Sequence, residues 1–283
     1  MGKTITKSIF GQGTKDEAIL GRGVYKAYGK GMEGFSVSSI QFGIHYMFEN
    51  MHTLENFLIN VVECTKLNGY FIGTSFDGEK IFHLLKDKSH NESIIIKDDT
   101  NSHTLLEITK LYDQDNYNND HSSLGYGVNV HQESINKTFK EYLVNYDYLV
   151  GMMEKFGFIP APTEDLANHK CMMETGIGTF EYLYKLMLED NKQSRGKRNE
   201  YGNASRLTKS EQKISFLNKY FIFKKVRNVN INDITIAMSQ KTKEDITGQS
   251  KETIALQEQI KTISKKNSME TKKSSKKLRI IPS

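Results

Sequence analysis

The spacing of apolar and polar residues predicts regular elements over roughly the first 225 positions of the chain. Residues 35–42 hold small serines among Phe35, Val37 and Ile40, which predicts a short buried strand. Apolar side chains recur every three or four positions over residues 51–62, which predicts a helix. Residues 70–76 are rich in aromatic and β-branched side chains and predict a second strand. Strand, helix and strand at this spacing indicate a βαβ unit in a parallel sheet.

The remaining elements are predicted from the same two periodicities and from turn residues. An apolar stripe at helical spacing over residues 139–153 predicts a helix that is ended by Gly157. The other predicted elements are a helix that follows Asp77-Gly78 and ends near Lys86, strands at 93–97 and 104–112, a loop at 113–123, a strand at 158–159, helices at 179–188 and 209–216, and a strand at 220–225.

Hydrophobic periodicity is lost after Val226, where Lys, Ser, Thr and Gln dominate. From Lys224 onward the chain holds 14 of its 39 basic and 6 of its 34 acidic residues, a net charge of about +8. The preceding part of the chain holds the other 25 basic and 28 acidic residues, so its net charge is about −3. We therefore expect a folded domain over 1–225 and a basic, low-complexity, disordered tail over 226–283, with one weak helix at about 250–264. The simplest interpretation is that the tail is only solvated, and the alternative is that its positive charge attracts RNA non-specifically.

Cysteine, histidine and apolar content exclude several classes of protein. Cys64 and Cys171 are far apart and lack metal-type spacing, so we expect no disulfide framework and a reducing, intracellular setting. The eight histidines form no HxxxH or HExxH pattern, and we expect no metal site. Apolar runs are far shorter than the ~20 residues of a membrane span, and no secretory signal is present.

Polar and aromatic side chains follow both predicted parallel strands. His45, Tyr46 and Glu49 come just after the first strand, and residues 74–77 end the second. The carboxyl ends of neighbouring strands meet at the edge where open α/β sheets bind ligands. This arrangement predicts a planar, hydrogen-bonding ligand. A His-Tyr pair packed beneath the start of a helix explains the same residues equally well.

Several short segments are similar to those of mRNA cap guanine-N7 methyltransferases. That family shows a QFxxHYxFE segment and, about twenty residues later, a GGYFIGT segment; residues 41–49 (QFGIHYMFE) and 69–74 (GYFIGT) match them. The pairing is specific, because neither segment is generic to the wider methyltransferase superfamily. Similarity continues at 141–146 (EYLVNY), 207–211 (LTKSE) and 219–224 (KYFIFK), and resembles most the capping enzymes of large DNA viruses.

The resemblance implies a pocket for the guanine of the mRNA cap. His45 corresponds to a histidine at the guanine edge, where an imidazole can donate to O6. Glu141, expected on a helix, corresponds to a glutamate that accepts hydrogen bonds from the N1 and N2 amines; without the resemblance it would be an exposed helix residue. Phe76 stands where cellular members have proline, and either residue offers an apolar wall. Tyr220 corresponds to an aromatic residue near the cap, with two extra residues between it and the LTKSE segment.

The resemblance also implies S-adenosylmethionine as the methyl donor. Gln41 corresponds to a residue at the donor, and Tyr46 lies beside both donor and substrate. Gln12 takes the place of an aspartate near the adenine. The DxGxGxGGD turn that grips the donor in the family does not occur in the 283 residues. We therefore expect a partial class I (Rossmann-like) α/β methyltransferase fold that lacks its first strands, in a fragment that needs its N-terminal half.

The resulting hypothesis is methyl transfer from S-adenosylmethionine to N7 of the cap guanine. The N7 lone pair is nucleophilic and the sulfonium is a good leaving group, so the protein positions the reactants and needs no general base. Expected partners are the capped 5′ end of mRNA (GpppN) and a polypeptide that carries the missing half or other capping activities, with no membrane. The expected location is nucleus or cytoplasm, or virion or viral factory for a viral chain. The alternative is a non-catalytic cap- or RNA-binding remnant.

Overall fold

The computed structural model describes residues 2–193, 201–234, 236 and 237. The chain separates into two units, Met1–Val229 and Asn230–Ser283, and the described residues lie almost entirely in the first. The helix predicted at 250–264 and most of the predicted disordered tail lie outside the described residues. The division of the chain at residue 225 stays a prediction.

The first sheet has five strands: β1 (Phe35–Gln41), β2 (Thr65–Phe76), β7 (Phe158–Pro160), β8 (Ile177–Thr179) and β9 (Asn218–Lys225). Their order is β1-β2-β9-β7, and β8 also pairs with β9. β1 and β2 run parallel, as predicted, whereas β9 is antiparallel to β2, β7 and β8. The prediction that β1 is buried is wrong, because most of its residues are exposed at the edge of the sheet. The α/β class predicted from the sequence is confirmed, in a sheet whose later strands reverse direction.

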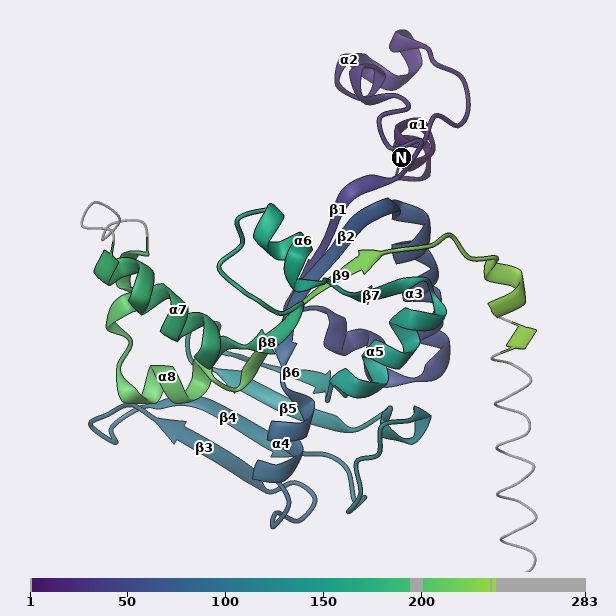
Figure 1. The fold of residues 1–283 in the computed structure, drawn as a ribbon. Coiled ribbons are helices and arrows are strands. Elements are labelled where there is room, and N and C mark those ends of the chain that lie inside the picture. The colour runs from purple at the N-terminus through teal and green to yellow at the C-terminus, as the bar shows by residue number, and fades with distance from the viewer. Residues whose placement is uncertain (1, 194–200, 235, 238–283) are drawn as a thin grey trace, which may run out of the picture. The chain divides into compact units, whose positions relative to one another are not determined.

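Helices cover both faces of this sheet. The predicted crossover helix is α3 (Met51–Cys64), which Asn50 caps and which joins β1 to β2. Figure 1 shows α3 and α5 (Tyr146–Lys155) on one side of the sheet and α7 (Phe180–Gln193) on the other. The next helix, α8 (Lys209–Ser215), packs against α7. The inner face of α3 buries the apolar residues that gave its helical spacing, Leu54, Leu58, Val61 and Val62.

The second sheet is an antiparallel meander of β3 (Ser93–Lys97), β4 (Thr104–Lys110), β5 (Gly127–Gln132) and β6 (Lys137–Tyr142). Its strands pack on α4 (Gly78–Leu84), the helix that follows β2. The core between them is aromatic: Phe82 of α4 stacks on Tyr112 and Tyr117, with ring centroids 5.8 and 5.2 Å away. The second sheet is thereby attached, through α4, to the carboxyl end of β2.

The start of α8 is fixed from two directions. Thr208 and Glu211 form a reciprocal capping box, in which each side chain accepts a hydrogen bond from the other residue's backbone N–H. Asp99, in the turn between β3 and β4, accepts hydrogen bonds from the backbone N–H groups of Lys209 and Ser210 (3.3 and 2.9 Å). A turn of the second sheet therefore positions the first turn of α8, which also contacts β3 and α7.

The helix predicted over 139–153 is wrong at its start. Residues 137–142 form β6, which pairs with β5, a strand that the sequence analysis missed. Asn136, with φ 51°, turns this hairpin. The helix begins only at Tyr146, because the side chain of Asn145 accepts a hydrogen bond from Tyr148 N (3.0 Å) and caps it.

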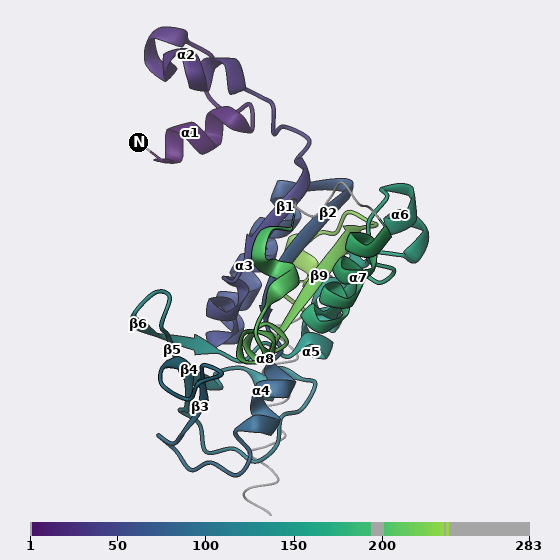
Figure 2. The ribbon, with the colours of Figure 1, turned by 90° about the vertical axis from the view of Figure 1, so that its left-hand side faces the viewer.

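The residues before β1 form two helices that the sequence analysis did not predict, α1 (Gly2–Ile9) and α2 (Glu17–Ala27). The rings of Phe10 and Phe35 are in contact (5.8 Å between centroids), which ties these helices to the amino end of β1. Figures 1 and 2 both show them beyond that end of the strand. The other short elements are η1 (Ile44–Glu49), η2 (His121–Ser123), α6 (Thr163–Asn168) and η4 (Gly202–Arg206). Among the described helices, none has the length and apolar character that a membrane crossing requires.

Close packing of the first sheet can be tested at Gly73 of β2. A methyl group there would collide with the carbonyl oxygen of Ile40 on β1 and with the ring of Phe221 on β9. We expect Gly73→Ala to lower the free energy of unfolding by about 1–3 kcal/mol, because both neighbouring strands must move. Gly151→Ala in α5 is the matched control: no atom lies within 4 Å of the added methyl, and alanine should stabilise the helix by about 0.5–1 kcal/mol. Urea unfolding measures both, and equal midpoints would contradict the close packing.

Candidate functional site

A cavity of about 440 Å³ lies at the carboxyl ends of β1 and β2. Its walls come from η1, from the β5–β6 hairpin, from the first residues of α7 and β9, and from α8. The two sheets thus contribute opposite walls. This is the edge of the first sheet at which the sequence predicted a ligand.

His45 and Glu141 lie side by side on the cavity wall. His45 belongs to η1, directly after β1, whereas Glu141 lies near the end of β6 in the second sheet. Nδ1 of His45 is 3.7 Å from Oε2 of Glu141, and their side chains are only 7% and 15% exposed. The ring of Tyr46 packs on the imidazole, with centroids 4.2 Å apart. The two positions that the resemblance assigned to guanine therefore share one surface.

Burial, rather than ion pairing, controls the protonation of this pair. Burial lowers the pKa of His45 to about 4, so its imidazole is neutral near pH 7. Burial also raises the pKa of Glu141 to about 7. Both shifts oppose an ion pair, and 3.7 Å is too long for a hydrogen bond. No described residue donates a hydrogen bond to Glu141, so donors from a ligand would stabilise its ionised form.

Most of the remaining wall is aromatic. Phe42, at the end of β1, is 54% exposed and has φ 49°, a left-handed conformation that costs a non-glycine residue about 1–2 kcal/mol. Its backbone N–H donates to Thr74 O (3.0 Å), which helps to hold this conformation. Phe180 packs against Phe42 at 6.1 Å between centroids, and Phe76 and Phe139 line the cavity from β2 and β6. Flat ring faces of this kind suit a planar ligand.

Comparison with known proteins agrees with this geometry. A family model for the mRNA (guanine-N(7))-methyltransferase domain matches residues 21–226. The chain belongs to this family. A relative named as a probable mRNA-capping enzyme of Acanthamoeba polyphaga mimivirus is 26% identical over 215 residues, which are 70% of this chain and 18% of the relative. The methyltransferase domain described here thus spans less than a fifth of that relative's length. The family resemblance found in the sequence is confirmed.

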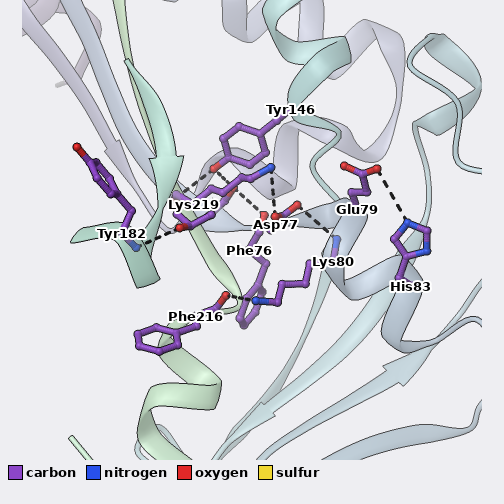
Figure 3. A network of polar contacts seen from close by, with 11 residues as sticks. Phe76, Asp77, Glu79, Lys80, His83, Tyr146, Tyr182, Phe216 and Lys219 are labelled. Atoms are coloured by element: carbon purple, nitrogen blue, oxygen red, sulfur yellow. Dashed lines mark hydrogen bonds and ion pairs between the residues drawn. The ribbon is translucent and has the colours of Figure 1, made fainter. Parts of the chain in front are cut away.

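A buried polar network lies beside the cavity, where β2 ends next to the start of β9 (Figure 3). Asp77 caps α4 by accepting from Lys80 N (3.4 Å), and its second oxygen pairs with Lys219 Nζ at 3.2 Å. The hydroxyl of Tyr146 donates to the Lys219 carbonyl (3.2 Å) and lies 2.9 Å from Ser75 Oγ. These contacts fix the strand ends that carry Phe76 and the first residue of β9.

The structure brings together two of the three residues that were predicted to bind the methyl donor. Gln41 ends β1, and Thr74 Oγ1 donates to its side-chain oxygen (2.9 Å) across the parallel pair. Tyr46 follows in η1, at the same edge. Gln12 lies instead in an exposed loop between α1 and α2, near the amino end of β1. The seven residues of β1 span about 20 Å, so the structure does not bring Gln12 to Gln41.

Tyr220, predicted at the substrate, is not among the residues that line the cavity. It is 3% exposed, and its hydroxyl donates to Thr175 O (3.1 Å). Asn218, two residues earlier on the same face of β9, lines the cavity instead. The two extra residues between the LTKSE segment and Tyr220 account for this displacement, since two strand residues span about 7 Å.

Sequence reasoning also missed several cavity residues. Phe139 lies two positions before Glu141 on β6, so both point from one face of the strand into the cavity. The alternation was visible in the sequence but was interpreted as helical spacing. Phe180 and Ile214 come from the first turn of α7 and from α8, and no motif marked them. Among the described residues, no group of three or more His, Cys, Asp or Glu could hold a metal ion.

The polar network beside the cavity predicts a loss of stability when Lys219 is replaced. Lys219→Met leaves the partly buried Asp77 carboxylate, 12% exposed, without its cation. We expect the free energy of unfolding to fall by about 1–3 kcal/mol, measured by urea unfolding. The control is Lys185→Met, which breaks the exposed Lys185–Glu181 pair. It should leave the free energy of unfolding in urea nearly unchanged. An equal response of the two variants would show that the Asp77 contact has no special role.

Proposed function

We propose that this cavity binds the guanine of a capped RNA and holds it for methyl transfer from S-adenosylmethionine to N7. The observation that carries the proposal is the placement of His45 beside Glu141, a neutral imidazole next to a carboxyl group without a hydrogen-bond donor among the described residues. Family membership favours this function over a non-catalytic cap-binding remnant. The name of the mimivirus relative, a probable mRNA-capping enzyme, supports capped RNA as the substrate.

The order of donor and acceptor on this wall matches guanine. The base presents the O6 acceptor next to the N1–H and N2 amine donors. A neutral imidazole can donate to O6 while the adjacent carboxylate accepts from N1 and N2. Adenine presents an N6 amine and an unprotonated N1, which reverses the order and leaves Glu141 opposite an acceptor. Unpaired buried polar groups make such a mismatch costly, so the cavity should reject adenine.

The chemistry that the chain must support is positioning. When bound, S-adenosylmethionine supplies an electrophilic methyl group on a sulfonium. The N7 lone pair needs no base, so the protein has to hold the purine plane in line with the methyl group. Methylation gives the purine a positive charge, and the ring faces of Phe42, Phe76 and Phe139 favour a cation against them. Exclusion of water by these walls strengthens both effects.

Part of the donor site is present on this chain. The Gln41 amide, the Thr74 hydroxyl and the Tyr46 hydroxyl lie at one sheet edge and can hydrogen-bond to a nucleoside. β1 pairs only with β2 among the described strands, and Phe35 and Val37 on it are 39% and 52% exposed. A free edge with apolar side chains can add a further strand. A strand added at this edge would bring further groups to the site of the methyl donor.

The raised pKa of Glu141 predicts that cap binding depends on pH. Guanine donors bind the carboxylate form, and the group has a pKa of about 7 without ligand. Below pH 7 binding must release a proton, so we expect the Kd for GpppG to rise by up to about tenfold per pH unit as pH falls from 7 to 5.5, and to level off above pH 8. Isothermal titration calorimetry in buffers of different ionisation enthalpy measures both the Kd and the released proton.

The control for this prediction is Glu141→Gln. It should bind GpppG about 10- to 100-fold more weakly at pH 8, because a charge-assisted acceptor is lost, and its Kd should not change between pH 5.5 and 8. The other titratable side chains on the cavity are His45, which is neutral over this range, Tyr46 and Glu211. If the Kd of the variant still depends on pH as in the wild-type protein, another group on the cavity and not Glu141 causes the dependence.

Methyl transfer itself provides the second test of the proposed function. The full chain is incubated with radiolabelled S-adenosylmethionine and GpppG-capped RNA, with and without a polypeptide that carries the DxGxGxGGD half. We expect transfer to GpppG-capped RNA in the presence of that half and at least tenfold less to ApppG-capped RNA, because the mismatch leaves Glu141 unpaired. Cap binding without transfer under either condition would instead identify a non-catalytic remnant.

A further inference from the structure

His45 and Asn218 both line the cavity and carry a buried polar atom, Nε2 and Oδ1, without a hydrogen-bond partner among the described residues. Of the two, Asn218 has no role in the proposed function. It is the first residue of β9, pairs across the sheet with Phe76, and lines the cavity although it is only 7% exposed. Its Nδ2 donates to the carbonyls of Ile214 and Ser215 at the end of α8 (3.2 and 3.0 Å). Its Oδ1 is buried and has no hydrogen-bond partner among the described residues.

These contacts fix which end of the amide lacks a hydrogen-bond partner. Two carbonyl oxygens face the amide nitrogen, so the opposite orientation would place oxygen against oxygen. The free group is therefore an acceptor. A buried acceptor without a partner is costly, and native structures keep few of them. A ligand that brings an N–H or O–H group would remove this cost.

Guanine has one such group left over. Its N2 amine carries two hydrogens, and Glu141 can take only one of them together with N1–H. On the basis of the proposed function, we propose that Asn218 Oδ1 accepts the second N2 hydrogen and is a specificity-determining residue for guanine. Asn218 lies on the strand next to the Phe76 wall, while Glu141 approaches from the opposite sheet. The two acceptors thus hold the amine from two sides, and a purine that lacks the amine leaves Asn218 unsatisfied.

The test compares GpppA with IpppA, in which inosine replaces guanosine and lacks the N2 amine, by calorimetric titration of the full chain. Wild-type protein should bind GpppA at least tenfold more tightly than IpppA. Asn218→Leu should weaken GpppA binding by about tenfold and leave IpppA within twofold. Asn218→Asp, which keeps an acceptor but loses the donors to α8, should retain the preference for GpppA.

A purely structural role of Asn218 predicts another pattern. Loss of the contacts with α8 would weaken both ligands equally, and Gln212→Ala is the matched control for this effect. Gln212 Nε2 donates to Leu207 O (2.9 Å) within the same helix region, but its side chain does not line the cavity. Melting temperatures of all variants separate unfolding from altered recognition.

The outcomes distinguish this inference from the proposed function. If wild-type protein fails to prefer GpppA over ApppA, the guanine site itself is refuted. If wild-type protein prefers GpppA over ApppA but Asn218→Leu weakens GpppA and IpppA equally, only the role of Asn218 is overturned. Equal binding of GpppA and IpppA by wild-type protein overturns the role of Asn218 together with the contact of Glu141 to N2. A loss confined to GpppA in Asn218→Leu supports the inference.

Discussion

Exclusion of water from the His45–Glu141 pair is the constraint on which the site depends. It keeps the imidazole neutral and holds the pKa of the carboxyl group near 7, so each side chain is available for a ligand instead of for its neighbour. The exclusion requires two sheets, because one residue follows β1 and the other lies on β6. Burial of a carboxyl group without donors opposes folding, and this is consistent with a residue that serves recognition rather than stability.

The scaffold reaches this arrangement through the end of β2. The strand delivers Phe76 to the cavity, turns at Asp77 into α4, and thereby carries the second sheet. Asp77 is paired with Lys219 at the beginning of β9, so the same residue joins both strands. A small set of buried polar contacts thus sets the distance between elements that are remote in sequence.

Much of the first sheet could be predicted from the sequence, because β1, α3 and β2 each have a clear periodicity and follow one another directly. Local spacing failed at Glu141: residues 139, 142, 143 and 146 lie at helical intervals, yet cross-strand pairing with β5 and the cap at Asn145 decide the structure. His45 and Glu141 nevertheless lie close together on the cavity wall, and their contacts with guanine stay a prediction. Gln12 and Tyr220 were placed by correspondence with family motifs, and the structure puts Gln12 at the other end of β1 and Tyr220 off the cavity wall.

The attachment of α8 to Asp99 has a consequence for how the domain responds to its ligand. The helix forms one wall of the cavity, while its first turn is held by a hairpin tip about 110 residues earlier in the sequence. Any ligand that fixes α8 also restricts the β3–β4 turn, since the two share hydrogen bonds that cannot be kept if either moves alone. Ligand binding in the cavity should therefore slow the exchange of backbone amides in the β3–β4 turn.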